Sequence, residues 1–315
     1  MPRVVHTAQV VMDLAIKLDQ LPEPGGDVFG EDTGMHVGGG FNVIYAARQM
    51  GADVEYAGSL GRGPFSDAAR EGLTAIGVQH TGPVVPGDLG YSVAVTDASS
   101  ERTFISTRGA ETRDPLGAFD NLTLDSKDVV YVSGYSMVHP ANRSALGRLF
   151  ERLGAHTQTI PRVVFDTSPV VADIPLASLR AIAELSPIWS TNERESSLLC
   201  TQLGGVAGSA SDNARKLSRK LGKVLVRVGS AGAWYSHNGE EPRHIPTHTV
   251  KAIDTNGAGD THSGVLCALL AEGMELCEAL LWANVAGALS TTVSGPATCP
   301  PRDRVATTVE SIHSS

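Results

Sequence analysis

Short β-branched runs that alternate with helical stretches constrain the fold of this chain more than any other feature. Three such runs lie in its middle, at Val129–Ser133, Arg162–Asp166 and Lys223–Val228. Helical stretches lie between and after them, at Ala141–Leu153, Leu176–Leu185, Ser209–Leu221, Asp260–Glu272 and Leu276–Thr292. This alternation is typical of βαβ units, whose parallel strands form a sheet with helices on both faces. We therefore predict an α/β fold built on a parallel sheet.

The first third of the chain has a different pattern. Ala8–Ile16 is typical of a strand, and Leu21–Gly40 is rich in Gly, Pro and Asp. Tyr91–Asp97 and Arg102–Thr107 indicate two strands of a hairpin around the turn-like stretch Ala98–Ser100. We expect a small β-element inserted into the α/β domain. No linker, repeat or low-complexity tract divides the chain, so a single domain over residues 1–315 is predicted.

Composition and charge exclude several classes of protein. A chain of 315 residues can bury one large core, and its formal net charge of −9 argues against a nucleic-acid partner. Four cysteines without CxxC spacing, and a first segment without a signal-peptide pattern, indicate a reduced, cytoplasmic protein. Glutamates interrupt the most apolar region, Val265–Leu289, so we expect no membrane helix.

The sharpest local signal is Asp254–Thr261, which reads Asp-Thr-Asn-Gly-Ala-Gly-Asp-Thr. It follows a strand-like stretch, His248–Ile253, and opens a helix. Gly257 and Gly259 leave the amides of the first turn open, and such amides with the helix dipole form an anion site. An acid in the first turn also caps a helix, so Asp260 alone has two interpretations.

Asp254–Thr261 is similar to the DTxGAGD signature of the ribokinase-like (PfkB) carbohydrate kinase family, and the resemblance runs from Asp13 to about Arg304. It implies a three-layer αβα sandwich with a mostly parallel central sheet and a small β-sheet lid from about 14–35 and 88–110. It also implies transfer of the γ-phosphate of ATP to a hydroxyl, with Asp260 as catalytic base. The amides of Gly257, Ala258 and Gly259 would form the anion hole, and Asp254 would help to hold a monovalent cation, potassium.

Three further motifs resemble the nucleotide-binding motifs of the family. Asn192–Glu195 matches NxxE, which implies ATP binding by Asn192 and a magnesium ion held by Glu195 through water. Without the resemblance, this motif would be a capping box at a helix start. Val228–Gly232 resembles the loop T-x-G-x-x-G, which implies ATP binding by Gly229 and Gly232, with Arg227 where the family often has Thr. Ala283–Ala288 resembles the helix that lines the adenine pocket, which implies ATP binding by Asn284.

The N-terminal half is expected to bind the acceptor. Asp13 ends the first predicted strand, where the family has an Asp that binds sugar hydroxyls. Gly38–Asn42 resembles GGxxxN, which implies substrate binding by Gly39, Gly40 and Asn42 before a helix at Val43–Met50. Asn42 could instead be an N-cap. Ribokinases carry a Glu where this chain has Gly134 and Tyr135, which argues against ribose itself.

Several alternatives stay open. The acceptor is a sugar or a sugar-like polyol, with a nucleoside as the main alternative within the family. Exposed edges of the lid would favour a homodimer formed through it. Gly61–Ser66 nearly matches the GxGxxG fingerprint of a Rossmann dehydrogenase, but the third Gly is missing. A binding protein that lost catalysis is a third class. Finally, His262 is expected to be a packing residue and not a ligand.

Overall fold

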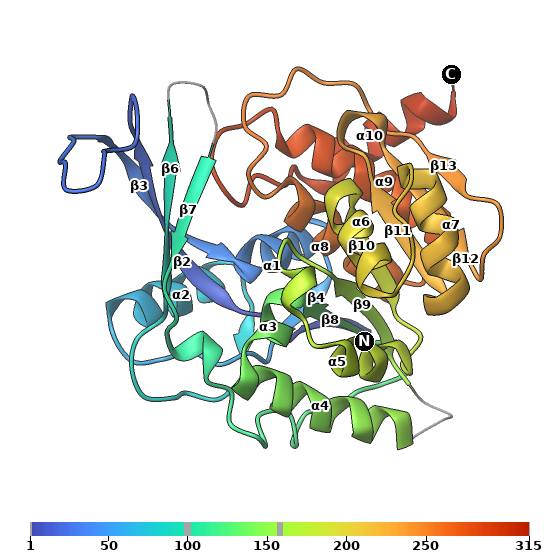
Figure 1. Cartoon of the computed structure of the whole chain (residues 1–315), viewed down its shortest axis with the longest axis horizontal. Coiled ribbons are helices and arrows are strands. Elements are labelled where there is room, and N and C mark those ends of the chain that lie inside the picture. Colours follow the sequence, from blue (N-terminus) through green and yellow to red (C-terminus); the bar gives the residue numbers. More distant parts are fainter. Residues whose placement is uncertain (1, 98–101, 156–159, 315) are drawn as a thin grey trace.

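The computed structural model describes residues 2–97, 102–155 and 160–314. Its two sheets stand side by side in Figure 1. The larger sheet has nine strands within the described residues, in the order β13-β12-β11-β10-β9-β8-β1-β4-β5. In that order they are Arg243–Ile245, Ala233–His237, Lys223–Arg227, Ile188–Asn192, Arg162–Asp166, Val129–Ser133, Arg3–His6, Asp53–Tyr56 and Gln79–His80. All neighbours from β11 to β5 pair in parallel, and β12 and β13 pair antiparallel.

Helices cover both faces of this sheet. One face carries α1 (Gly40–Gln49), α2 (Pro64–Ala75), α8 (Ala258–Ala271), α9 (Leu276–Ser290) and α10 (Arg302–His313). The other carries α3 (Gly134–Val138), α4 (Pro140–Ala155), α5 (Leu176–Ala183), α6 (Glu193–Gln202) and α7 (Ala210–Leu221). The predicted three-layer α/β fold is confirmed.

The strands of the sheet are apolar on both sides because each side packs against helices. In β8, Val129 and Tyr131 join the core under α1 and α8, whereas Val130 and Val132 join the core under α4 and α5. Successive side chains of a strand point to opposite faces, so a doubly covered strand reads as a continuous apolar run. This is why the predicted strands at Val129–Ser133 and Arg162–Asp166 agree with β8 and β9 in both bounds.

The smaller sheet has the order β3-β2-β6-β7, with strands Glu31–Gly39, Val10–Lys17, Tyr91–Thr96 and Arg102–Ser106. β2 pairs antiparallel with β3 and parallel with β6, and β6 pairs antiparallel with β7. A small β-element made from the first third of the chain is therefore confirmed. The predicted turn at Ala98–Ser100 lies outside the described residues.

Three local predictions are wrong. His248–Ile253 is an irregular connection and not a strand: Ile253 is 71% exposed, and its amide donates to the carbonyl of Thr291 after α9 rather than to a neighbouring strand. Asp13 lies in the middle of β2 and not at the end of a strand, and β2 is the second strand, because the sequence prediction missed β1. The helix predicted to begin at Val43 begins at Gly40, which makes Gly39 the N-cap and excludes Asn42 from that role.

Candidate active site

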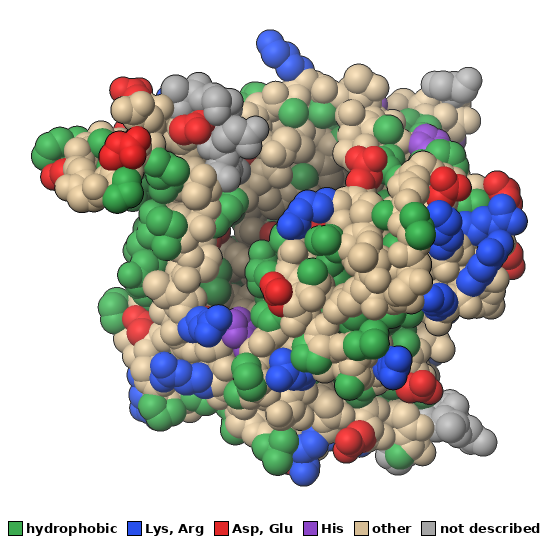
Figure 2. Space-filling view, viewed as in Figure 1, with side chains coloured by type: hydrophobic (Ala, Val, Ile, Leu, Met, Phe, Trp, Pro, Cys, Tyr) green, Lys and Arg blue, Asp and Glu red, His purple; other side chains and the backbone are tan. Residues whose placement is uncertain are grey.

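The candidate site lies at the carboxyl ends of β9, β10 and β11, which is the edge where open α/β sheets bind ligands. Each of these strands ends in a polar side chain: Asp166, Asn192 and Arg227. Asn192 and Arg227 are register partners across β10 and β11. The first turn of α8 faces this edge, because the Arg227 guanidinium donates to the carbonyl of Gly259 (Nη1 to O, 3.1 Å). In Figure 2 the surface is hollowed between the small sheet and the body of the molecule.

Asp260 is the third residue of α8, and it does not cap its own helix. The N-cap is Gly257, in the left-handed conformation (φ 71°), and this cap position makes no side-chain hydrogen bond. Asn42 in α1 instead donates from Nδ2 to Oδ2 of Asp260 over 2.9 Å. The structure thus brings together two predicted site residues that lie 218 positions apart in the chain.

The surroundings of Asp260 favour a carboxyl that titrates near neutrality. Burial raises its pKa to about 6, and the nearby charge of Asp166 adds to the rise. The hydrogen bond from Asn42 and the charge of Arg227 act in the opposite direction. A carboxyl with a pKa in this range is ionised at neutral pH and is a better proton acceptor than an ordinary aspartate.

The predicted acceptor residues Asp13, Gly39 and Gly40 form, together with Gly38, one close-packed corner between β2, β3 and α1. A Cβ on Gly38 would lie 2.0 Å from Oδ2 of Asp13, so the carboxylate of Asp13 rests directly over the backbone of β3. Gly39 adopts φ 60°. A Cβ on Gly40 would lie 2.3 Å from Cε1 of the buried His6. Close approach at positions 38 and 40, and the left-handed backbone at position 39, therefore favour glycine there, whatever these residues bind.

Glu195 forms the capping box that its spacing predicts. Asn192 Oδ1 accepts from the amide of Glu195 (2.8 Å), and the Glu195 carboxylate accepts from the Asn192 amide (2.9 Å). The same carboxylate also accepts from Nδ2 of Asn192 (2.8 Å) and from the Thr167 hydroxyl (3.1 Å). Burial and the charge of Asp166 raise the pKa of Glu195, and Arg227 opposes this rise. The capping role therefore coexists with a place in a buried polar cluster.

Arg227 lies at the centre of that cluster. Its Nη1 is 3.2 Å from Oδ2 of Asp166, and its Nη2 is 3.7 Å from Oε2 of Glu195. Its Nε donates to the carbonyl of Thr191 (3.4 Å). Sequence reasoning missed Asp166, which also accepts from the Ser263 hydroxyl (2.9 Å) of α8. An acid at the carboxyl end of a predicted strand was the signal that could have found it.

The other predicted nucleotide residues lie around this cluster. Gly229 (φ 56°) begins a turn after β11, and a Cβ added there would meet nothing within 4 Å, so this side of the turn is open. Gly232 (φ 90°) is packed against the backbone of Ile245 and Pro246. Asn284 donates both hydrogens of its Nδ2 to the carbonyls of Ile245 and Pro246 (3.0 Å each). Its amide therefore shapes the wall between β13 and α9.

Asp254 joins the loop before α8 to the loop after α9. Its Oδ1 accepts from the amide of Asn256 (2.8 Å), and its Oδ2 accepts from the amide of Gly295 (2.9 Å). His262, in the second turn of α8, is buried against Gly287 of α9, and burial lowers the pKa of its ring to about 3. The position is consistent with the prediction that His262 is a packing residue.

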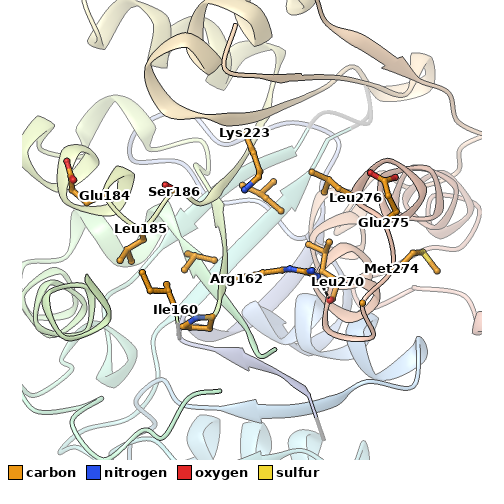
Figure 3. Close-up of a pocket in the computed structure, with 14 residues that line it drawn as sticks. Ile160, Arg162, Glu184, Leu185, Ser186, Lys223, Leu270, Met274, Glu275 and Leu276 are labelled. Atoms are coloured by element: carbon orange, nitrogen blue, oxygen red, sulfur yellow. Dashed lines mark hydrogen bonds between the residues drawn. The ribbon is translucent and has the colours of Figure 1, made fainter. Parts of the chain in front are cut away.

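A wide recess lies at the opposite edge of the sheet (Figure 3). It has a volume of about 750 Å³ and lies at the amino ends of β9, β10 and β11, beside the last turn of α8. Its lining is mainly apolar, with charges of both signs from Arg162, Lys223, Glu184 and Glu275. None of the predicted site residues lines it, so its size does not make it the active site.

The near match to a dinucleotide fingerprint at Gly61–Ser66 has a structural explanation. The carboxylate of Asp88 accepts from the amides of Phe65 (3.0 Å) and Ser66 (2.7 Å) at the start of α2. A side chain of the protein therefore already occupies the anion site that a dinucleotide phosphate would need.

This chain resembles known proteins over most of its length. The family described as pfkB family carbohydrate kinase matches residues 1–303. The uncharacterized sugar kinase YegV of Escherichia coli is 28% identical over 282 residues, which cover 89% of this chain and 86% of that protein. The ribokinase of Mus musculus is 27% identical over 308 residues, which cover 93% of this chain and 90% of that protein.

Solved structures share the fold. The ribokinase of Thermotoga maritima superposes with a TM-score of 0.82 at 22% identity, over 98% of this chain and 100% of that chain. The adenosine kinase of Sinorhizobium meliloti also gives 0.82, at 16% identity, over 97% of this chain and 98% of that chain. At these identities the likeness concerns the fold alone.

The family match covers nearly the whole chain and includes every motif that the sequence analysis compared with this family. It confirms the predicted family and leaves the dehydrogenase and the non-catalytic binding protein without support. The chain belongs to the pfkB family of carbohydrate kinases, and it is an ATP-dependent phosphotransferase that acts on a hydroxyl of a sugar or sugar-like substrate.

Proposed function

We propose that Asp260 is the catalytic base of this kinase and that the amides of Gly257, Ala258 and Gly259 form its anion hole. The hydrogen bond from Asn42 carries the proposal, because it ties the carboxylate to α1 and not to the first turn of its own helix. Asp260 takes the proton of the acceptor hydroxyl, and the first-turn amides and the helix dipole stabilise the transferred phosphoryl group.

The γ-phosphate of ATP would lie at the start of α8, with the rest of the nucleotide along the turn after β11. The open side of Gly229 leaves room for the nucleotide there, and Asn192 stands beside it at the end of β10. Asn284 and Gly232 act indirectly, since both hold the wall between β13 and α9.

Magnesium fits this site as an ion that the nucleotide carries. The described residues contain no cluster of three acidic, histidine or cysteine side chains that could hold a metal ion. Mg²⁺ usually keeps several waters and uses one or two carboxylates together with substrate phosphates. We propose that Glu195 contacts the ion through water, and the bound ion would neutralise charge on the phosphates.

Potassium is proposed beside Asp254. The carboxylate of Asp254 accepts the backbone amides of Asn256 and Gly295, and it ties together two loops next to the anion hole. A cation held there would fix the loop that precedes α8.

The acceptor would bind between Asp260 and Asp13, the two acids that are predicted to contact its hydroxyls. Tyr135, which is 46% exposed, is close enough to feel these acids: partial desolvation raises the pKa of its phenol, and the charges of Asp260, Asp166, Glu195 and Asp13 add to the rise. A nucleoside remains the alternative acceptor, because an adenosine kinase shares the fold.

We further propose that the small sheet, near residues 14–35 and 88–110, is a lid of one single-domain kinase and that two copies pair through it. Large apolar side chains on this element, including Phe104 and Ile105, are exposed. A cytoplasmic location is proposed because all four cysteines are free. Among the described residues no helix is long and apolar enough to cross a membrane.

The test is a screen of sugars, sugar acids, polyols and nucleosides for acceptor-dependent release of ADP, run in potassium and in a bulky organic cation. Asp260→Asn is the control variant. Turnover should fall by about 10²–10⁴, the usual contribution of a general base. Its melting temperature at pH 7 should equal or exceed that of the parent, because an ionised carboxyl with a raised pKa opposes folding.

The capping interpretation predicts the opposite pattern for this variant. Turnover would stay near normal, and about 1 kcal/mol of stability would be lost. An Asp260→Asn protein that keeps more than about a tenth of parental turnover would exclude Asp260 as the base. Equal rates in potassium and in the organic cation would exclude the potassium site.

A further inference from the structure

We propose that Arg227 is a positioning residue for phosphate transfer, in that its guanidinium ties the anion-hole loop at Gly259 to the buried acids Asp166 and Glu195. The inference rests on the proposed function, because it assigns the anion hole to the first turn of α8. It adds a role for a side chain that stands where the family often has a threonine.

The contacts of Arg227 connect three elements. Nη1 reaches the Gly259 carbonyl (3.1 Å) at the start of α8 and Oδ2 of Asp166 (3.2 Å) at the end of β9. Nη2 lies 3.7 Å from Oε2 of Glu195, in the first turn of α6. The planar, forked guanidinium reaches such divergent acceptors from separate nitrogens, whereas a lysine ammonium has a single nitrogen and a threonine hydroxyl has a single donor hydrogen.

The cluster is desolvated, so its charges matter. The side chain of Arg227 is 14% exposed, that of Asp166 is 10% exposed and that of Glu195 is 3% exposed. Two buried carboxylates without a cation would repel each other and the phosphates beside them. Arg227 supplies that cation permanently, before any nucleotide or metal binds.

Gly259 is matched to this contact. A Cβ at position 259 would lie 3.0 Å from Nη1 of Arg227, closer than side chains normally approach. The carbonyl of Gly259 therefore accepts from the guanidinium on one side of the loop. Its amide, on the other side, stays available for the phosphoryl group. The order of the anion hole should accordingly depend on Arg227 even in the protein without ligand.

The chain offers a matched control at the far end of the same helix. Arg162 at the start of β9 donates from Nη1 to the carbonyl of Leu270 (2.7 Å), in the last turn of α8, and Figure 3 shows this bond at the edge of the recess. Arg162→Thr thus also removes one arginine–carbonyl contact from α8, but it does so at the opposite edge of the sheet from Asp260.

The experiment compares Arg227→Lys, Arg227→Gln and Arg162→Thr in two measurements. The first is amide hydrogen exchange of residues 258–264 in the protein without ligands. The second is kcat, with the KM for ATP, for the best acceptor. We expect faster exchange in both Arg227 variants only. We expect kcat to fall about tenfold in Arg227→Lys, which keeps the charge without the fork, and about 100-fold in Arg227→Gln, the scale of loss for a displaced catalytic group.

Each other outcome overturns the proposal. Full kcat in Arg227→Lys would mean that only the charge of Arg227 matters and not its forked geometry. Full kcat in Arg227→Gln would mean that Arg227 has no role in phosphate transfer. Unchanged exchange at 258–264 in both variants, or loss of folding in both while Arg162→Thr folds, would make Arg227 a residue of general stability. If the parent protein shows no acceptor-dependent release of ADP with any acceptor of the screen, the proposed function is refuted, and the exchange measurement still decides the role of Arg227.

Discussion

The carboxylate of Asp260 is held by an amide from another helix, and this separates it from the other acids near helix starts in this chain. Asp212 and Glu195 both complete capping boxes of their own helices. The sequence alone could not make this distinction, because all three acids stand in a first turn. The deciding partner of Asp260, Asn42, lies 218 residues away. Motifs predicted which residues belong to the site, whereas their contacts required the folded chain.

The raised pKa of Asp260 predicts a pH profile. As the proposed base, Asp260 must be ionised, so kcat/KM should be level above about pH 7 and should fall with unit slope as the pH drops below the pKa of about 6. The hydrogen bond from Asn42 lowers that pKa, so Asn42→Ala should move the falling limb to higher pH. The measurement is kcat/KM between about pH 4.5 and about pH 9, so that the profile covers both sides of that pKa.

Gln49→Ala, on the same helix as Asn42, is the control and should leave the profile unchanged. A limb that stays in place in Asn42→Ala would mean that another group titrates. A limb near the ordinary pKa of an aspartate, about 4, would mean that the site does not shift the pKa of Asp260.

At the scale of elements, the sequence predicted the strand–helix alternation well because doubly covered strands must be continuously apolar. It failed where an element lacks that signature. β3 contains Gly34, Gly38 and Gly39, residues that normally indicate a loop, and it forms a strand at the edge of the small sheet. His248–Ile253 has an apolar pattern but contacts the end of α9, which no local pattern could reveal.

Close packing of α1 against α8 positions the pair Asn42–Asp260, and Gly264 makes that packing feasible. A Cβ on Gly264 would lie 2.2 Å from the carbonyl of Val43 and 2.8 Å from Cβ of Ala46. Gly264→Ala should therefore cost about 1–3 kcal/mol of stability, as overpacked cores do. It should also lower kcat more than it changes the KM for ATP, because the helices that carry the pair must separate.

Gly147→Ala is the matched control for this prediction, since a Cβ there, in α4, would meet nothing within 4 Å. It should be neutral or stabilising by about 0.5–1 kcal/mol, the helix preference of Ala over Gly. Chemical denaturation of both variants is the measurement. A Gly264→Ala protein as stable as the Gly147→Ala protein would contradict the role given to the α1–α8 contact.

At the scale of the whole molecule, the small sheet leaves apolar surface uncovered. Neighbouring strand residues point to opposite faces, yet Phe104 is 53% exposed and Ile105 is 60% exposed, so neither face of the edge strand β7 is covered there. Figure 2 shows hydrophobic side chains gathered along this side of the molecule. Exposed apolar surface on an edge strand favours pairing with another chain.

We therefore expect a homodimer in solution, with a mass near twice the 33.0 kDa of one chain, by light scattering at micromolar concentration. Charged residues prevent edge strands from pairing, so the double substitution Phe104→Lys and Ile105→Lys should give the monomer mass. Val206→Lys replaces an apolar residue that is 81% exposed in the loop after α6, and it should leave the dimer intact. A monomeric parent protein would refute the dimer, and dissociation by Val206→Lys alone would place the interface elsewhere.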